Sequence, residues 1–154
     1  MADRQLSANF QLSEFLVSQT AAREGIANVP TQQDVENLEQ LCQQVLEPVR
    51  TLLGGRPIFI SSGYRSMALN AVVGGAQGSD HLFGRAADLT CPGFGSVRGI
   101  WNHLRGAPGL PFHQLIREFD QDDHGWLHIS WRPPAERQHQ VLIIDRNGTQ
   151  VLPA

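Results

Sequence analysis

Two histidines and one aspartate are the residues of this chain best suited to chemistry. His81 and Asp88 lie seven residues apart, and His128 follows far downstream in the segment Gly125-Trp126-Leu127-His128-Ile129-Ser130. Two imidazoles and one carboxylate are a standard protein ligand set for a catalytic zinc ion, which keeps its fourth coordination position open. The three residues therefore predict a zinc site with hydrolytic chemistry.

The neighbours of these residues are consistent with a buried site. Asp88 lies in the otherwise apolar run 86–89, where a carboxylate is costly to bury unless it is paired or binds a metal. His128 lies between two apolar residues, and in a strand it would share a face with Ser130. Spacing alone leaves a metal site and an ordinary paired carboxylate as equally good interpretations.

The hydrophobic pattern predicts the elements that must position these residues. Apolar residues recur at helical spacing over 35–53, after a capping box at 31–34, which predicts one long helix with a kink at Pro48. Shorter helices are predicted at 66–73 and 97–104, and strands at 57–61, 86–89, 115–119, 127–131 and 141–144. We therefore predict an α+β fold, a single domain over residues 1–154, with a small antiparallel sheet flanked by N-terminal helices.

The composition argues against several classes of function. The net charge is −3, the isoelectric point is near 6.0, and no run of lysine and arginine occurs, so we expect neither a nucleic-acid nor a membrane-surface partner. The N-terminal segment has no apolar core typical of a signal peptide, and no stretch is long enough to span a bilayer. We therefore expect synthesis in the cytoplasm without a signal peptide.

Three motifs in order resemble the zinc D-Ala-D-Ala carboxypeptidases. They are Ser61-Ser62-Gly63-Tyr64-Arg65-Ser66, Ser79-x-His81-x-x-Gly84-x-Ala86-x-Asp88 and Trp126-x-His128, within a resemblance over about residues 9–131. These peptidases include vancomycin-resistance carboxypeptidases and phage L-alanyl-D-glutamate endopeptidases, and hedgehog signalling domains share their fold. The resemblance implies that His81, Asp88 and His128 bind one zinc ion. It also implies that Arg65 contacts a carboxylate or carbonyl of the substrate, which suits its planar guanidinium.

One position departs from the pattern of this family. Many members carry an acidic residue, the general base, three positions before the last histidine ligand, and this chain has Gly125 there. We predict Glu118 as the base, because a hairpin of 115–119 and 127–131 would place it opposite His128 and facing the metal.

Other candidate residues keep their alternatives open. Asp123 and His124 take the place of Glu118 as the base if the acidic loop folds over the metal. Ser79 is a candidate substrate contact or a plain loop cap. Trp126 is a candidate wall of the cleft or a core residue beside the last ligand.

The resemblance also implies a substrate, the stem peptide of bacterial peptidoglycan. The enzyme would be a D,D-carboxypeptidase or an endopeptidase of the L-Ala-D-Glu type. The lack of a signal peptide suits a monomeric phage or prophage enzyme that acts in lysis or is tail-associated. Such an enzyme reaches the cell wall through a holin or within a virion, where other phage proteins are its partners. Two alternatives are a non-catalytic structural or cell-wall-binding phage module that retains the fold, and a cytoplasmic dipeptidase for D-Ala-D-Ala.

Overall fold

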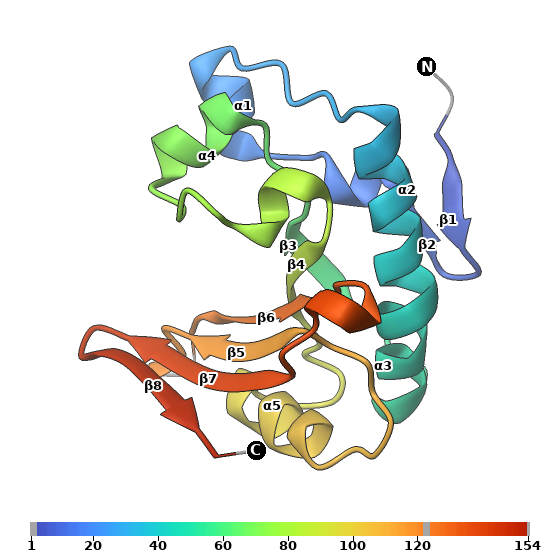
Figure 1. The fold of residues 1–154 in the computed structure, drawn as a ribbon, viewed down its shortest axis with the longest axis vertical. Coiled ribbons are helices and arrows are strands. Elements are labelled where there is room, and N and C mark those ends of the chain that lie inside the picture. Colours follow the sequence, from blue (N-terminus) through green and yellow to red (C-terminus); the bar gives the residue numbers. More distant parts are fainter. Residues whose placement is uncertain (1–2, 122–123, 154) are drawn as a thin grey trace.

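Helices occupy the first part of the chain and strands the second, as the sequence predicts. The computed structural model describes residues 3–121 and 124–153. A short hairpin of β1 (Gln5–Ser7) and β2 (Phe10–Gln11) comes first, followed by the 3-10 turn η1 (Leu12–Phe15) and helix α1 (Gln19–Glu24). This hairpin, which the sequence analysis did not predict, packs beside the long helix that follows (Figure 1).

The predicted long helix is present and is interrupted once. It consists of α2 (Gln32–Leu41), the π-helical turn η2 (Cys42–Leu46) and α3 (Glu47–Leu52). The capping box is confirmed, because the Thr31 hydroxyl accepts from the Asp34 backbone N–H at 3.1 Å and the Asp34 carboxylate accepts from the Thr31 N–H at 2.9 Å. Instead of a simple kink, the π turn lies immediately before Pro48, which cannot donate the regular backbone hydrogen bond.

The sheet has six strands and is mixed rather than purely antiparallel. The strands are β3 (Phe59–Ser62), β4 (Ala86–Thr90), β5 (Gln114–Glu118), β6 (Trp126–Ser130), β7 (Gln140–Asp145) and β8 (Gly148–Leu152), in the spatial order β3-β4-β6-β5-β7-β8. Every pairing is antiparallel except that of β5 with β7. The chain leaves β6, passes through the 3-10 turn η5 (Pro134–Glu136) and returns beside β5 in the same direction. The predicted antiparallel sheet is thus wrong for this one pair, and β8 was not predicted.

The two faces of the sheet have different surroundings. Helix α5 (Val97–Arg105) covers one face, whereas α1, α4 (Met67–Val73) and the 3-10 turn η3 (Asp80–Phe83) lie on the other side of the β3–β4 end (Figure 1). Because side chains alternate along a strand, the core receives one set of residues from the central strands, namely Ala87, Leu89, Leu115, Leu127 and Ile129. The alternate set, which includes Asp88, Ile116 and His128, faces the opposite side of the sheet.

Candidate active site

The three predicted metal ligands lie together on this second face. Asp88 on β4 and His128 on β6 are direct cross-strand partners. His81 comes from η3, where the Ser79 hydroxyl caps the turn by accepting from the His81 backbone N–H at 3.2 Å. Two ligands on paired strands and a third on a capped turn give the cluster a rigid frame, because neither element can shift without breaking backbone hydrogen bonds.

The donor atoms of these residues converge on one point. His81 Nε2 lies 3.2 Å and His128 Nδ1 lies 3.0 Å from Oδ1 of Asp88, and one ligand atom from each residue lies within 4.8 Å of the others. The exposed fractions are 2% for His81, 4% for Asp88 and 7% for His128. The site is therefore both compact and shielded from solvent.

The orientation of His81 suits it to bind a metal through Nε2. Its Nδ1 lies 2.6 Å from the carbonyl oxygen of Gly63, and a carbonyl only accepts, so Nδ1 carries the proton. The lone pair of the ring then lies on Nε2, on the side of Asp88. Such a backbone partner is the usual means of fixing the tautomer of a metal-binding histidine. The two imidazoles and one carboxylate thus fit a zinc ion, whose remaining position would open into the groove.

Charge within the cluster keeps Asp88 ionised. Burial by itself would raise the pKa of the Asp88 carboxyl, but His81 and His128 together hold that pKa well below its ordinary range. Burial would likewise lower the pKa of His128, and Asp88 outweighs this effect and raises it. Asp88 thus stays a carboxylate, the charged form in which it could bind a metal ion.

Arg65 lies beside the cluster and is held by three side chains. Its Nη2 lies 3.5 Å from Asp88 Oδ2, its Nε donates to the Ser62 hydroxyl at 3.2 Å, and its Nη1 donates to Asn70 Oδ1 at 3.2 Å. Asn70 is buried and donates to the Ala76 carbonyl at 3.0 Å, which ties α4 to the loop after it. Neither Ser62 nor Asn70 was predicted as a site residue. Ser62 lies inside a quoted motif, whereas nothing in the sequence marks Asn70.

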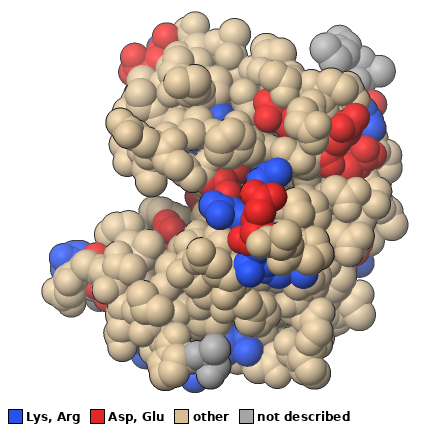
Figure 2. All heavy atoms as spheres, viewed as in Figure 1, with Lys and Arg blue, Asp and Glu red and all other residues tan. Residues whose placement is uncertain are grey.

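A groove of about 670 Å³ lies over these residues. The glycine-rich loop 74–79 forms one wall, and strands β5, β6 and β7 form the floor. The space-filling view shows the surface hollowed between the α1–α4 part and the β5–β8 part of the molecule, with acidic and basic side chains at the inner end (Figure 2). The groove is lined by Arg65, Ser79, His81, Asp88, Glu118, Trp126, His128 and Arg132, and by the apolar Ile116, Leu142 and Ile144.

Glu118 faces this groove, although not in the predicted register. Ile116, rather than Glu118, is the direct partner of His128, and Glu118 pairs with Trp126. The expected position was therefore wrong by two residues. Because side chains repeat every second residue along a strand, Glu118 still lies on the same face as His128. The Trp126 indole N–H donates to Glu118 Oε2 at 2.7 Å, and burial raises the pKa of the Glu118 carboxyl in spite of the nearby His128.

The backbone explains why Gly125 carries no acidic side chain. Its φ is +83°, and a Cβ atom there would lie 2.2 Å from the carbonyl oxygen of Glu118 and 2.5 Å from that of Phe119. No L-residue fits such a position without moving the end of β5. Of the other predicted bases, His124 is exposed and does not line the groove, and Asp123 lies outside the described residues.

Ser79 and Trp126 both lie at the groove, and their predicted contacts with a substrate stay predictions. Ser79 caps η3, and it also lines the groove. Trp126 is half-buried, lines the groove and contacts the Phe119 ring, with 5.7 Å between the centroids. Phe119 has a φ of 50°, an uncommon conformation for a residue with a side chain, at the end of β5 where the groove begins.

Comparison with known proteins identifies the family. A family model described as Peptidase M15 matches residues 8–124. The chain belongs to this family. The M15 match covers the helical part of the chain, two of the predicted ligands, His81 and Asp88, and the predicted base Glu118. Family membership places the chain in a class of peptidases, and its His-Asp-His cluster fits the zinc cofactor.

One curated relative has a similar segment. The zinc D-Ala-D-Ala carboxypeptidase of Streptomyces albus G is 46% identical over 44 residues. The similar segment makes up 29% of the M15 chain. It covers only 17% of the length of the carboxypeptidase. In the part of the M15 chain that the structure describes, no helix is long and apolar enough to cross a membrane.

Proposed function

We propose that this M15 chain is a zinc-dependent peptidase that hydrolyses peptide bonds in the stem peptides of bacterial peptidoglycan. The observation that carries the proposal is a single groove that contains a compact His-Asp-His cluster, an arginine held by three side chains and a half-buried glutamate. The family match and the similarity to the zinc D-Ala-D-Ala carboxypeptidase of Streptomyces albus G support the same activity.

In this proposal each side chain of the groove has one role. His81, Asp88 and His128 would hold the zinc ion, which supplies a Lewis acid that polarises the scissile carbonyl and acidifies water. Glu118 accepts the proton of the attacking water and returns it to the leaving amine. Arg65 binds a carboxylate or carbonyl of the substrate next to the metal.

Trp126 is a positioning residue in this scheme. Its N–H donates to Oε2 of Glu118, and among the described residues Oε1 has no hydrogen-bond partner, so it is available for proton exchange in the groove. A carboxylate that is fixed by one hydrogen bond needs no reorganisation when the proton moves. Ser79 similarly holds the turn that carries His81, in addition to lining the groove.

The finer assignments are also proposals. The cut bond is the terminal D-Ala-D-Ala bond or a bond of the L-Ala-D-Glu type, and the setting is phage or prophage lysis or a phage tail. We propose that residues 1–154 form one monomeric domain, because a single cluster of buried side chains joins the long helix to both ends of the sheet.

A non-catalytic module that retains the fold is the alternative function. The missing acidic residue at position 125 is the feature that favours it. Glu118 argues for catalysis instead, because a half-buried carboxyl with a raised pKa in the same groove is not needed by a protein that only binds the cell wall.

The test is metal content together with hydrolysis of purified cell-wall sacculi, with product masses recorded. We expect one zinc ion per chain and soluble peptide fragments whose masses identify the bond. His128→Ala should lose the bound zinc and should release no fragments. His103→Ala, which alters an exposed histidine on α5, should keep the zinc and the activity. Zinc without cleavage of any sacculus would favour the non-catalytic module, and absence of zinc would refute the metal site.

A further inference from the structure

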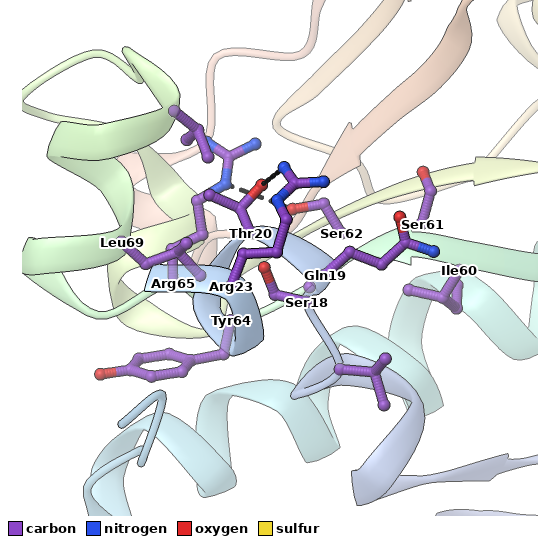
Figure 3. Close-up of a pocket in the computed structure, with 13 residues that line it drawn as sticks. Ser18, Gln19, Thr20, Arg23, Ile60, Ser61, Ser62, Tyr64, Arg65 and Leu69 are labelled. Atoms are coloured by element: carbon purple, nitrogen blue, oxygen red, sulfur yellow. Dashed lines mark hydrogen bonds between the residues drawn. The ribbon is translucent and has the colours of Figure 1, made fainter. Parts of the chain in front are cut away.

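A second cavity adjoins the groove on the far side of Arg65. It measures about 530 Å³ and is formed by residues of α1, β3 and α4 together with the segments 17–18 and 63–65 (Figure 3). Both cavities are lined by Arg65 and Val73, so they meet at these two side chains. The groove therefore does not end at Arg65.

The lining of this second cavity is cationic and rich in hydroxyl groups. Arg23 projects from α1 beside Arg65, and its Nη2 lies 3.4 Å from the Thr20 hydroxyl (Figure 3). Within the described ranges 3–121 and 124–153, no carboxylate lines the cavity or forms an ion pair with Arg23. Arg65 differs, because it has Asp88 as a partner. Arg23 is exposed, and because no described carboxylate pairs with it, its guanidinium is available to an anionic group of a ligand.

The wall opposite Arg23 is the edge of the sheet. β3 is the terminal strand, and Ile60, Ser61 and Ser62 line the cavity. Among the described residues, the backbone of 59–62 forms hydrogen bonds only with β4. An open edge offers N–H and C=O groups to an extended chain, which is a common way to bind peptides.

We propose that this cavity is a second subsite, which binds the part of a stem peptide that continues past Arg65 and holds one of its carboxylates on Arg23. The inference rests on the proposed function and deepens it. It requires a substrate longer than a dipeptide, because a dipeptide at the metal would not reach beyond Arg65. Arg23 is thus a specificity-determining residue rather than a catalytic one.

The test compares three synthetic peptides. These are the stem L-Ala-γ-D-Glu-L-Lys-D-Ala-D-Ala and two derivatives, one amidated at the D-glutamate α-carboxylate and one at the C-terminus. Arg23→Gln should raise KM for the parent peptide about 3- to 5-fold with kcat unchanged, as expected for a partly exposed ion pair. One of the two amides lacks the carboxylate that Arg23 binds. For that amide, Arg23→Gln should leave KM unchanged. Arg98→Gln, an exposed arginine on α5, is the matched control and should not alter KM.

An equal effect of Arg23→Gln on all three peptides, or no effect on any, would overturn the subsite. Calorimetric binding of the same peptides to zinc-loaded Glu118→Gln, with and without Arg23→Gln, separates this result from the proposed function. Carboxylate-dependent binding through Arg23 without hydrolysis by the wild type would support the subsite and refute the peptidase. Hydrolysis without that dependence would support the peptidase and refute the subsite.

Discussion

Asp88 and Glu118 face the same groove from strands β4 and β5, yet their surroundings act on them in opposite directions. Asp88 lies between two imidazoles and beside Arg65, and its pKa is held below the ordinary range in spite of burial. Glu118 has the Trp126 N–H as its hydrogen-bond partner, and burial raises its pKa. Asp88 is buried and Glu118 only half-buried, yet the more deeply buried carboxyl has the lowered pKa, so burial alone does not explain the difference.

The comparison indicates how one groove can give two carboxylates different tasks. A group surrounded by positive partners keeps its charge and can hold a cation, whereas a buried group with few partners gains and loses a proton more readily. The end of the groove at β4 is therefore suited to the metal, and the end of β5 to proton transfer. Four substitutions test this division.

The largest effect is expected from substitution of Asp88, at the β4 end of the groove. Asp88→Asn should reduce zinc from one ion per chain to none and reduce peptide hydrolysis to background, because it removes a ligand and the negative charge of the cluster. Metal analysis after dialysis, with circular dichroism as a check of the fold, measures this. Stoichiometric zinc in the folded variant would mean that Asp88 is not a ligand.

Glu118→Gln should separate activity from metal binding. We expect one zinc ion per chain and a kcat about 10²- to 10⁴-fold lower, the range for loss of a general base. His124→Ala should keep its activity, since that side chain is exposed and outside the groove. The opposite pattern, an active Glu118→Gln and an inactive His124→Ala, would place the base in the loop.

Substitutions of Gly125 test whether this position has room for a side chain, such as the acidic residue of other family members. Gly125→Ala should lower the free energy of unfolding by about 1–3 kcal/mol from the strain of a φ of +83°. The close approach of the new Cβ to the Glu118 carbonyl oxygen should add to this loss. Gly106→Ala, where a Cβ meets open space, is the control and should stay within about 0.5 kcal/mol. Chemical denaturation measures both. Equal stability of the two variants would contradict the steric explanation, as would recovery of activity in Glu118→Gln by Gly125→Glu.

Trp126→Phe should produce the smallest change. It removes the hydrogen bond to Glu118 but keeps an aromatic ring in the groove, so we expect about a 10-fold loss of kcat/KM. Because the indole N–H lowers the pKa of Glu118, its loss should raise that pKa further and move the acidic limb of the pH–rate profile to higher pH. An unchanged profile with reduced activity would indicate that Trp126 contacts the substrate rather than Glu118.

Local chemistry accounts for the parts of the fold that the sequence predicted well. The capping box, the helical stripe and the glycines that follow helices report on contacts within a few residues, and α2, α4, α5 and most strands appear where expected. The β1–β2 hairpin was missed because it packs against the distant long helix. β8 was missed although it follows β7 through a tight turn, because its side chains are mostly exposed and leave no apolar pattern in the sequence. The parallel pairing of β5 with β7 depends on how η5 directs the chain, which no local pattern encodes.

The sequence by itself determined which side chains can bind a metal and that Asp88 needs a partner, because residue type fixes donor atoms and the cost of burying a charge. The tertiary structure alone decided that β4 and β6 pair in the register that joins Asp88 to His128, that Glu118 lies two residues from its expected position, and that Gly125 has no room for a side chain. It also placed the cavity lined by Arg23 next to the groove, with Arg65 lining both. These outcomes depend on strand register and on contacts between distant segments, which arise only when the chain packs.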